Sequence, residues 1–520
     1  MIEAVKNFFK GGFEEIDEVL VKPFLRLSFY QKCFWIILAG IALYLPYLNT
    51  FNATHDEQYT MLMCRFNVFD MIKTISIEDG HPPFSYLYAK LWLEAFGGDV
   101  HNILALRFAT LFVFLMTAML GVFPLKRLMG QKVALLWICL VFVLPSSFYL
   151  AMNMRMYPLA VFLIAGEFMY AMLFVYKKQK GDLFLFSLFT LVALYTHYYC
   201  AILSAVIWFI VLIDLWRARK WRDMIHFLIS GFIVAVLFAP WLGAFVLQYQ
   251  NMKETWYPGE KHTIWAINGA FFSYRYIVQN YYLFCVGFGI LCWLLVWEFL
   301  LDTKKDKEEH MIVKRATMVF WSIYLIALVL SIFLRPNLAA IYLVIPVGLF
   351  YIGIAVAVLH FKKFRKIFLT LFVPVFVMGY SENYLKVHDN AYKNMQQFIA
   401  ENIPQNSLIL YNYTRAQLPI MFYAPQVDRY YVPMKKYLVL LQDEVIAEKE
   451  NLKNIDKYDK IYHLSSLWDL VEFSDCKAQF TSQYDGISLC FKEMDKQKAL
   501  SLIKAKQGIR ELSFHKTSLW

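Results

Sequence analysis

The chain has 520 residues, of which 59% are hydrophobic and 18% aromatic, and its formal net charge is +11. This composition excludes an ordinary soluble protein of the same length, which carries more polar residues and divides into several domains. Lys and Arg that collect in the cytoplasmic loops of a membrane protein explain the positive charge. The sequence has no nucleic-acid-binding motif, so we expect no nucleic acid among its partners.

Residues 1–32 form a charged, amphipathic leader that we expect to lie in the cytoplasm. Its acidic residues lie between positions 14 and 18, and no small-residue cleavage site precedes the first apolar segment. We therefore expect no removable signal peptide, and the first membrane span would serve as an uncleaved anchor.

Residues 33–380 contain apolar segments of about the length that crosses a bilayer at a rise of about 1.5 Å per residue. They predict an α-helical polytopic membrane protein with about eleven transmembrane helices. The fifth and sixth segments are short, so a broken helical hairpin is an alternative to two full spans there. The segments lie at 34–50, 104–124, 133–151, 157–176, 183–197, 200–216, 225–247, 276–300, 316–334, 338–359 and 367–380.

Basic residues cluster in alternate connections between these segments. With the N-terminus inside the cell and the C-terminus outside, all five clusters face the cytoplasm, as the positive-inside rule requires. The outer face then holds a first loop at 50–103, several short connections and the tail, and we expect the chemistry there. The basic clusters lie within 126–132, 177–180, 217–222, 304–307 and 362–366.

The tail, residues 381–520, is polar and reads as a small α/β domain outside the cytoplasm. Helical spacing at 392–403 and 439–453 alternates with expected strands at 407–413 and 460–465, a pattern typical of an α/β fold. About 140 residues suffice for an independent core. Cys476 and Cys490 both lie in this tail, so they could form a disulfide if it is extracytoplasmic.

The first outer loop opens with THDEQY at 54–59, where Asp56 and Glu57 are adjacent. A second polar stretch, DGHPP at 79–83, leads into a helix expected at 83–96, and prolines suit its first turn. Apolar residues recur at helical spacing in this helix, which predicts an amphipathic helix in the membrane interface. Such a loop would hold a carboxylate at the depth of a lipid phosphate. The apolar residues are Phe84, Leu87, Tyr88, Leu91, Trp92 and Ala95.

Five stretches in order resemble one family over about residues 34–380. They are HDEQY, HPPFSYLYAKLWLEAFG, LRFATLFVFLMTAMLG, NMRMYPLAVFL and LYTHYYCAIL. They are similar to the bacterial GT-C integral-membrane glycosyltransferases, the branch related to protein O-mannosyltransferases and the lipid A aminoarabinose transferase. The resemblance implies a GT-C fold and transfer of a sugar from a polyprenyl-phosphate donor to an envelope acceptor, normally with inversion. It places the protein in a bacterial cytoplasmic membrane, with the reaction on the outer face.

The resemblance also implies the catalytic carboxylate. Asp56 matches the acidic residue of the family's first outer loop, so it is the expected general base. Glu57 is the fallback, and it would otherwise orient the acceptor or hold a metal. The alternative for both is a solvated acidic pair without a role in catalysis.

Arginines at the outer ends of spans are candidates for binding the donor phosphate, because a planar guanidinium matches phosphate oxygens. Arg155 and Arg335 lie at such ends. The alternative is that each reaches lipid headgroups for purely structural reasons.

Two histidines are further candidates for the donor site. His81 stands where the aminoarabinose transferases have a basic residue before two prolines, so it would contact the phosphate or a metal, or cap the helix. His197, followed by Tyr198, would line the cavity or simply suit an interface. The sequence does not decide whether a divalent metal is bound, or whether His55, His81 and His197 come together as its ligands. Many relatives have Glu where this chain has Asn153 and Met154, which puts a second acid there in doubt.

A multi-span transporter or flippase of lipid-linked precursors is the alternative from another class. It predicts inverted repeats and acids inside the spans; the chain shows no clear repeat, and Asp214 is expected to pair with Arg217, whereas Glu167 has no evident partner. A non-catalytic scaffold, or a glycan polymerase or ligase, also stays open. The sequence does not name the sugar, the acceptor or the carrier length.

Overall fold

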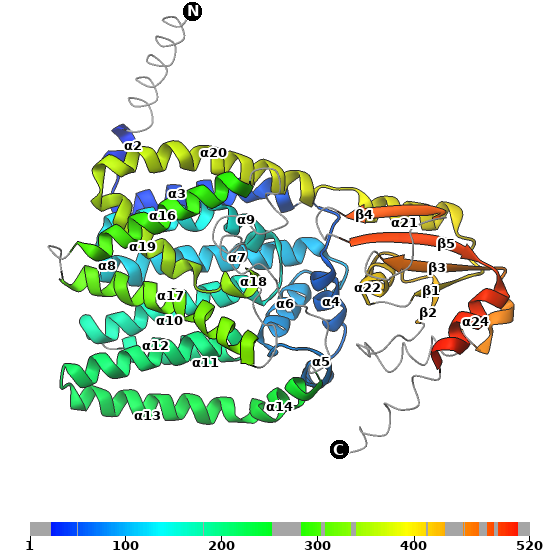
Figure 1. Cartoon of the computed structure of the whole chain (residues 1–520), viewed down its shortest axis with the longest axis horizontal. Coiled ribbons are helices and arrows are strands. Elements are labelled where there is room, and N and C mark those ends of the chain that lie inside the picture. Colours follow the sequence, from blue (N-terminus) through cyan, green and yellow to red (C-terminus); the bar gives the residue numbers. More distant parts are fainter. Residues whose placement is uncertain are drawn as a thin grey trace, which may run out of the picture.

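The computed structural model describes residues 22–48, 50–179, 181–251, 282–302, 307–333, 340–411, 414–431, 451, 453–466, 476–482 and 487–507. The protein has two parts (Figure 1): a long bundle of helices and, at one end of it, a small domain built on a β-sheet. The expected fold class, a helical membrane protein with a small C-terminal α/β domain, is therefore confirmed.

Every segment expected to span the membrane overlaps a helix of the bundle. Among the described residues, seven helical stretches are long and apolar enough to cross a membrane, and three shorter helices are also apolar. The polytopic helical fold is thereby confirmed, and the count of eleven crossings stays a prediction. The bundle helices are α2 (Lys22–Arg26), α3 (Phe29–Leu48), α7 (Ile103–Leu120), α8 (Lys126–Val143), α9 (Pro145–Met152), α10 (Met156–Tyr176), α11 (Asp182–Leu194), α12 (Tyr198–Arg217), α13 (Trp221–Phe238), α14 (Leu242–Asn251), α16 (Tyr282–Leu301), α17 (Lys307–Phe333), α18 (Ala340–Leu343), α19 (Val347–His360) and α20 (Lys362–Val387).

The second and third expected spans belong to one continuous helical stretch, Ile103–Val143. A π-helical turn, η2 (Gly121–Leu125), joins α7 to α8, and α8 itself is kinked at Gly130. Gly130 has φ +83° and ψ 172°, a backbone conformation that only glycine adopts without strain. The kink divides a stretch that is longer than one bilayer crossing requires.

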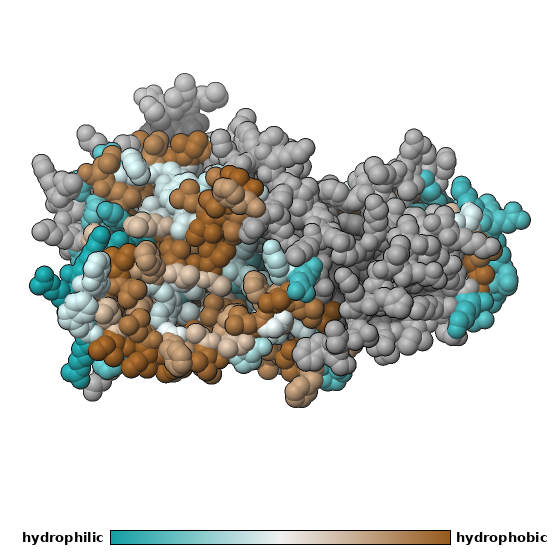
Figure 2. Space-filling model, turned by 60° about the horizontal axis from the view of Figure 1, so that its bottom comes forward, coloured by the Kyte–Doolittle hydropathy of each residue, from teal (hydrophilic) through white to brown (hydrophobic). Residues whose placement is uncertain are grey.

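The outside of the bundle is apolar. Figure 2 shows hydrophobic residues over much of the visible face of the helices and hydrophilic ones at the far end of the sheet domain. On α13, for example, Phe232 is 70% exposed. Apolar side chains on this scale are stable when lipid tails cover them.

Glu167 and Asp214, two acids inside the spans, have structural partners. Glu167 accepts hydrogen bonds from Thr190 Oγ1 at 2.8 Å and Ser204 Oγ at 2.7 Å. Asp214 pairs with Arg315 of α17, with Nε 3.2 Å from Oδ2, so the expected pairing with Arg217 is wrong. The reason is packing: α12 and α17 lie against each other, whereas Arg217 is exposed at the end of α12.

The connections expected in the cytoplasm gather at one end of the bundle. Lys177 pairs with Glu308 at 2.5 Å and Arg127 with Asp182 at 3.0 Å, which links three of these connections. The loop 50–103 and the sheet domain occupy the opposite end (Figure 1). The charge pattern thus separates the two ends correctly, and which end faces the cytoplasm stays a prediction.

The first loop is largely helical, although only its last helix was expected. It contains α4 (His55–Met63), α5 (Val68–Glu78) and α6 (Phe84–Ala95), of which α6 coincides with the helix expected at 83–96. The side of α6 with Tyr86 and Leu93 is buried in the protein, whereas Leu91, on the expected apolar face, is 65% exposed. This orientation suits a helix whose outer face meets lipid.

The C-terminal domain contains a five-stranded sheet with the order β2-β1-β3-β5-β4. Strands β2, β1 and β3 are parallel, and β5 and β4 continue the sheet in antiparallel fashion. The strands expected at 407–413 and 460–465 are confirmed as β1 and β3, whereas most of the helix expected at 439–453 lies outside the described residues. The elements are α21 (Ala391–Asn402), β1 (Ser407–Tyr411), α22 (Thr414–Tyr423), β2 (Asp428–Tyr431), β3 (Lys460–Ser466), β4 (Ala478–Ser482), β5 (Ile487–Met494) and α24 (Lys496–Gln507).

Two features of this domain bear on its place in the cell and its attachment. Cys476 and Cys490 form a disulfide bond, the pairing that the sequence left open. The last bundle helix, α20, continues seven residues beyond position 380, where the sequence placed the domain boundary, so the domain is attached through a continuous helix.

Candidate active site

The segment that enters the first loop is held by the C-terminal domain. The backbone N–H of Ala53 donates to Tyr423 Oη at 2.8 Å, and Asn52 Nδ2 donates to the carbonyls of Val387 at 3.1 Å and Asp389 at 2.6 Å. These partners lie more than 330 residues away in the chain. The domain therefore fixes the backbone immediately before the acidic pair.

Glu57 is enclosed in a buried ion pair. Its side chain and that of Arg107 are both fully buried and in close contact. Arg107 Nη2 also donates to the carbonyl of Asn52 at 2.8 Å, and Glu57 accepts from the backbone N–H groups of Met154 at 2.8 Å and Thr54 at 2.9 Å. Thr54 and Glu57 form a capping box at the start of α4. Glu57 thus joins three segments and is closed to a substrate.

Asp56 has the opposite surroundings, although it is the neighbouring residue. Successive residues of a helix point about 100° apart, so the burial of Glu57 turns Asp56 outward. Its side chain is 47% exposed, and Oδ2 lies 3.8 Å from Arg155 Nε. His55 Nδ1 lies 3.8 Å from its other oxygen. Of the two predicted acids, Asp56 is the one that a substrate can reach.

Arg155 lies beside Asp56 in the turn before α10. Its Nη1 donates to Tyr86 Oη at 2.9 Å and to Thr60 Oγ1 at 3.0 Å, and the guanidinium lies over the rings of Tyr59 and Tyr86. The side chain is buried, and its Nε has no hydrogen-bond partner among the described residues. One charged donor at this site is thus available to an anion.

Asp79 is a second acid near Arg155, and no role was predicted for it. It accepts hydrogen bonds from the Tyr86 hydroxyl and from the backbone N–H of Gly80, the latter at 2.7 Å. Burial raises the pKa of the Asp79 carboxyl, and the positive charge of Arg155 opposes this shift. Tyr86 bonds to both residues, so Asp79 and Arg155 form one network.

The two predicted histidines come together. The rings of His81 and His197 stack with their centroids 4.9 Å apart. His197 Nδ1 accepts a hydrogen bond from the Tyr199 backbone N–H at 3.0 Å, which places the ring proton on Nε2. That Nε2 and His81 Nδ1 are buried and have no hydrogen-bond partner among the described residues. Both are candidates for contact with a polar ligand.

Burial keeps both histidines neutral. It lowers the pKa of His81 to about 3, with the positive charge of Arg155 as the next cause. It also lowers the pKa of His197 well below its usual value, to which His81 and Arg155 add. The positive charge of Arg155 thus disfavours protonation of both rings.

The lowered pKa of His81 predicts loss of stability in acid. Between pH about 3 and 6.5 the unfolded chain binds a proton on this histidine that the folded chain does not, so the free energy of unfolding falls as the pH falls. At pH 5 we expect His81 to cost about 1 to 2 kcal/mol relative to pH 7.5. Thermal melts in detergent at both pH values would measure this. The His81→Asn variant should lose less stability on acidification, and the exposed control His101→Asn should behave like the wild type. Equal losses in wild type and His81→Asn would contradict the prediction.

Tyr198, another of the predicted residues, lies beside this centre. Tyr198 donates to Gln248 Oε1 and accepts from Trp241 Nε1 at 3.1 Å, and Gln248 Nε2 donates to the carbonyl of His81 at 3.2 Å. Tyr198 therefore supports the His81 loop through Gln248. Arg335 lies outside the described residues.

A metal site is not formed by the residues that the structure describes. No group of three or more His, Cys, Asp and Glu side chains among them is placed to hold a metal ion. The suggested grouping of His55, His81 and His197 is not formed, because His55 pairs with Asp56 instead.

The fold is that of the GT-C membrane glycosyltransferases. The solved structure of ArnT from Cupriavidus metallidurans in the apo state matches with a TM-score of 0.57 and 11% identity, over 88% of this chain and 97% of that chain. ArnT bound to undecaprenyl phosphate matches over the same shares, with a TM-score of 0.54 and 11% identity. The apo oligosaccharyltransferase of Archaeoglobus fulgidus has a TM-score of 0.47 and 12% identity, over 85% of this chain and 70% of that one. No family model and no curated protein matches the sequence. The expected GT-C fold is confirmed.

Proposed function

We propose that this protein is a membrane glycosyltransferase that moves a sugar from a polyprenyl-phosphate donor to an envelope acceptor. The observation that carries the proposal is a half-exposed carboxylate, Asp56, beside a buried arginine with an unused donor, Arg155 Nε. The GT-C fold supports the same reaction class, and one of the ArnT structures contains undecaprenyl phosphate.

Asp56 acts as the general base. An acceptor oxygen attacks the anomeric carbon of the sugar, and its proton passes to the Asp56 carboxylate as the new bond forms. The bond between the anomeric carbon and the phosphate oxygen breaks, and polyprenyl phosphate leaves with the electron pair, which inverts the anomeric configuration. Proton transfer to a positioned base contributes about 10²- to 10⁴-fold to the rate of such a step.

The leaving phosphate is bound by the groups that lack partners. It gains negative charge as the bond breaks, so it needs fixed donors more than an acid. Arg155 Nε supplies a charged donor, and the N–H at Nε2 of neutral His197 supplies a second. His81 Nδ1 supplies a third when its ring carries the proton there. These side chains come from three separate segments of the chain, which all reach one end of the bundle.

The reaction takes place on the outer face of a bacterial cytoplasmic membrane. The site lies at the end of the bundle that carries the disulfide-bonded domain (Figure 1), and disulfides persist outside the reducing cytoplasm. The opposite end gathers the basic connections that the positive-inside rule assigns to the cytoplasm. The N-terminus is therefore inside and the C-terminal domain outside.

The proposal is tested with purified protein in detergent and a panel of polyprenyl-phosphate sugars. A crude envelope fraction supplies the acceptor, and release of free polyprenyl phosphate is measured with EDTA or with added divalent cations. We expect release from at least one donor that depends on the acceptor. Donor binding without turnover for the entire panel would favour the non-catalytic or transport alternatives. The EDTA arm decides the metal requirement.

A further inference from the structure

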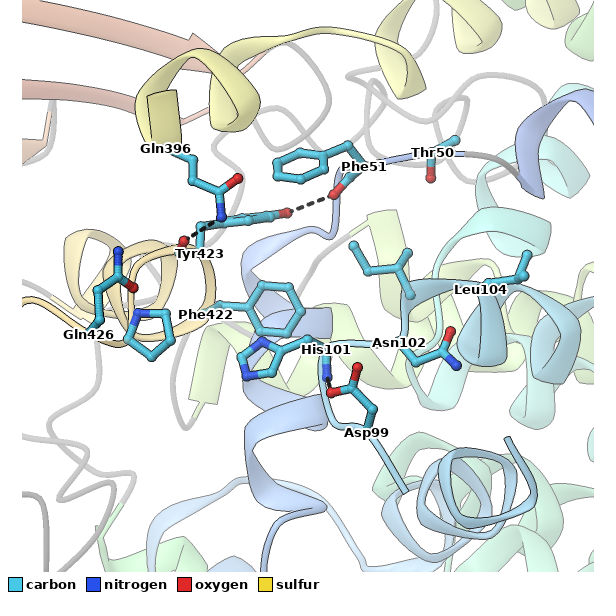
Figure 3. Close-up of a pocket in the computed structure, with 12 residues that line it drawn as sticks. Thr50, Phe51, Asp99, His101, Asn102, Leu104, Gln396, Phe422, Tyr423 and Gln426 are labelled. Carbon is cyan, nitrogen blue, oxygen red and sulfur yellow. Dashed lines mark hydrogen bonds between the residues drawn. The ribbon is translucent and has the colours of Figure 1, made fainter. Parts of the chain in front are cut away.

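A crevice of about 610 Å³ separates the end of the first loop from the C-terminal domain (Figure 3). One wall comes from residues 50–51 and 99–104, and the other comes from α21 and the end of α22. None of the predicted site residues that the structure describes lines the crevice.

The lining side chains combine hydroxyl-binding groups with aromatic rings. Asp99, Gln396 and Gln426 bring a carboxylate and two amides, which both accept and, for the amides, donate hydrogen bonds. The ring of Phe422 packs against His101 with the centroids 4.9 Å apart, and Figure 3 shows both rings beside the polar groups. Flat apolar rings among convergent polar groups suit the two faces of a sugar ring.

The charge of the lining argues against an anionic ligand. Among the described residues, those that line the crevice include neither Lys nor Arg, although the chain has 51 of them. A phosphate or a carboxylate would find no permanent positive charge in this described lining, and the Asp99 carboxylate would repel it. An extended peptide is also disfavoured, because the described walls consist of helices and connecting segments, with no strand to pair with its backbone.

The crevice adjoins the proposed base. Phe51, in its wall, is five residues before Asp56, and a chain of five residues spans at most about 17 Å. Tyr423, also in the wall, accepts from the Ala53 N–H and donates to the Phe51 carbonyl at 3.3 Å. The hydrogen bonds that fix the acidic segment therefore fix its distance from the crevice as well.

We propose that this crevice binds the acceptor through neutral sugar units next to the hydroxyl that is glycosylated. The proposal rests on the proposed function and names the class of acceptor, a carbohydrate without charged groups in the bound part. The bound sugars would hold the acceptor while its reactive hydroxyl reaches Asp56.

Binding is measured directly with the full-length protein in detergent. The probes are fluorescently labelled neutral oligosaccharides released from bacterial envelope glycans, with labelled peptides and phosphorylated glycolipids as comparison. Gln426→Trp places a large ring in the crevice, and Gln397→Trp is the matched control, because Gln397 is exposed on the same domain and does not line the crevice. We expect a neutral oligosaccharide to bind the wild type and the control, with at least a tenfold loss of affinity in Gln426→Trp.

Turnover separates this proposal from the proposed function. With an active enzyme, Gln426→Trp should raise KM for the acceptor, leave kcat within about twofold, and leave the affinity for polyprenyl phosphate unchanged. Equal acceptor KM in Gln426→Trp and wild type would overturn the crevice as the acceptor site while leaving the transferase standing. Binding of peptides or phosphorylated glycolipids in place of every neutral oligosaccharide would also overturn it. Failure of the proposed function is instead seen as donor binding without acceptor-dependent release of polyprenyl phosphate from any donor of the panel.

Discussion

Replacing Asp56 with asparagine is expected to lower the rate of sugar transfer by about 10²- to 10⁴-fold, because the amide cannot accept the acceptor's proton. The change keeps the size of the side chain, which is 47% exposed. Donor affinity and thermal stability should therefore stay near the wild-type values. Single-turnover release of polyprenyl phosphate measures the rate, and quenching by a labelled donor measures the affinity.

Asp70→Asn provides the control for this variant, because Asp70 is an exposed acid in the first turn of α5 in the same loop. It should retain full activity. If Asp56→Asn keeps more than half of the wild-type rate, Asp56 is not the base. Asp79 then becomes the next acid to test, in place of Glu57, because it lies in the Arg155 network whereas Glu57 is sealed by Arg107.

Much of the fold follows from apolar length and charge. Spans such as 157–176 are mainly apolar segments of bilayer length, and α10 covers Met156–Tyr176. The positive-inside rule then separates the two ends of the bundle. The number of crossings does not follow from apolar length alone, because α11 and α19 are shorter than the usual span.

Part of the candidate active site could also be predicted, because topology places its residues. Asp56 and His81 lie in the first outer loop, and Arg155 and His197 lie at the outer ends of spans, so the predicted topology brings all four to one end of the bundle. Which of the two adjacent acids, Asp56 or Glu57, is buried depends on how α4 is rotated about its axis. The Thr54–Glu57 spacing is a capping-box signal that could have indicated it.

Other contacts could not be read from the sequence. Arg107 lies within an apolar run, and its presence there indicates that a buried partner exists but not which one. The bond from Ala53 to Tyr423 joins residues 370 positions apart, and strands β2, β4 and β5 are short and dispersed. Each of these features depends on tertiary packing, which local patterns do not specify.

The second large effect concerns the buried pair of Glu57 and Arg107. Glu57→Gln and Arg107→Met should each destabilise the protein by about 3–5 kcal/mol, because each leaves the other charge buried without its counter-charge. The double variant should recover part of this loss, since both charges are then removed. Thermal melts and yields in detergent would measure the effect.

Glu94 provides the control for the buried pair, because its side chain is exposed. Glu94 pairs with Lys90 on α6, but its side chain is 61% exposed, so Glu94→Gln should cost less than about 1 kcal/mol. If Glu57→Gln instead melts like the wild type and is inactive, Glu57 takes part in the chemistry rather than in holding the site. Loss of stability with partial rescue in the double variant would establish that Glu57 stabilises the fold through Arg107. Of the two adjacent acids, Asp56 is then the one left for the reaction.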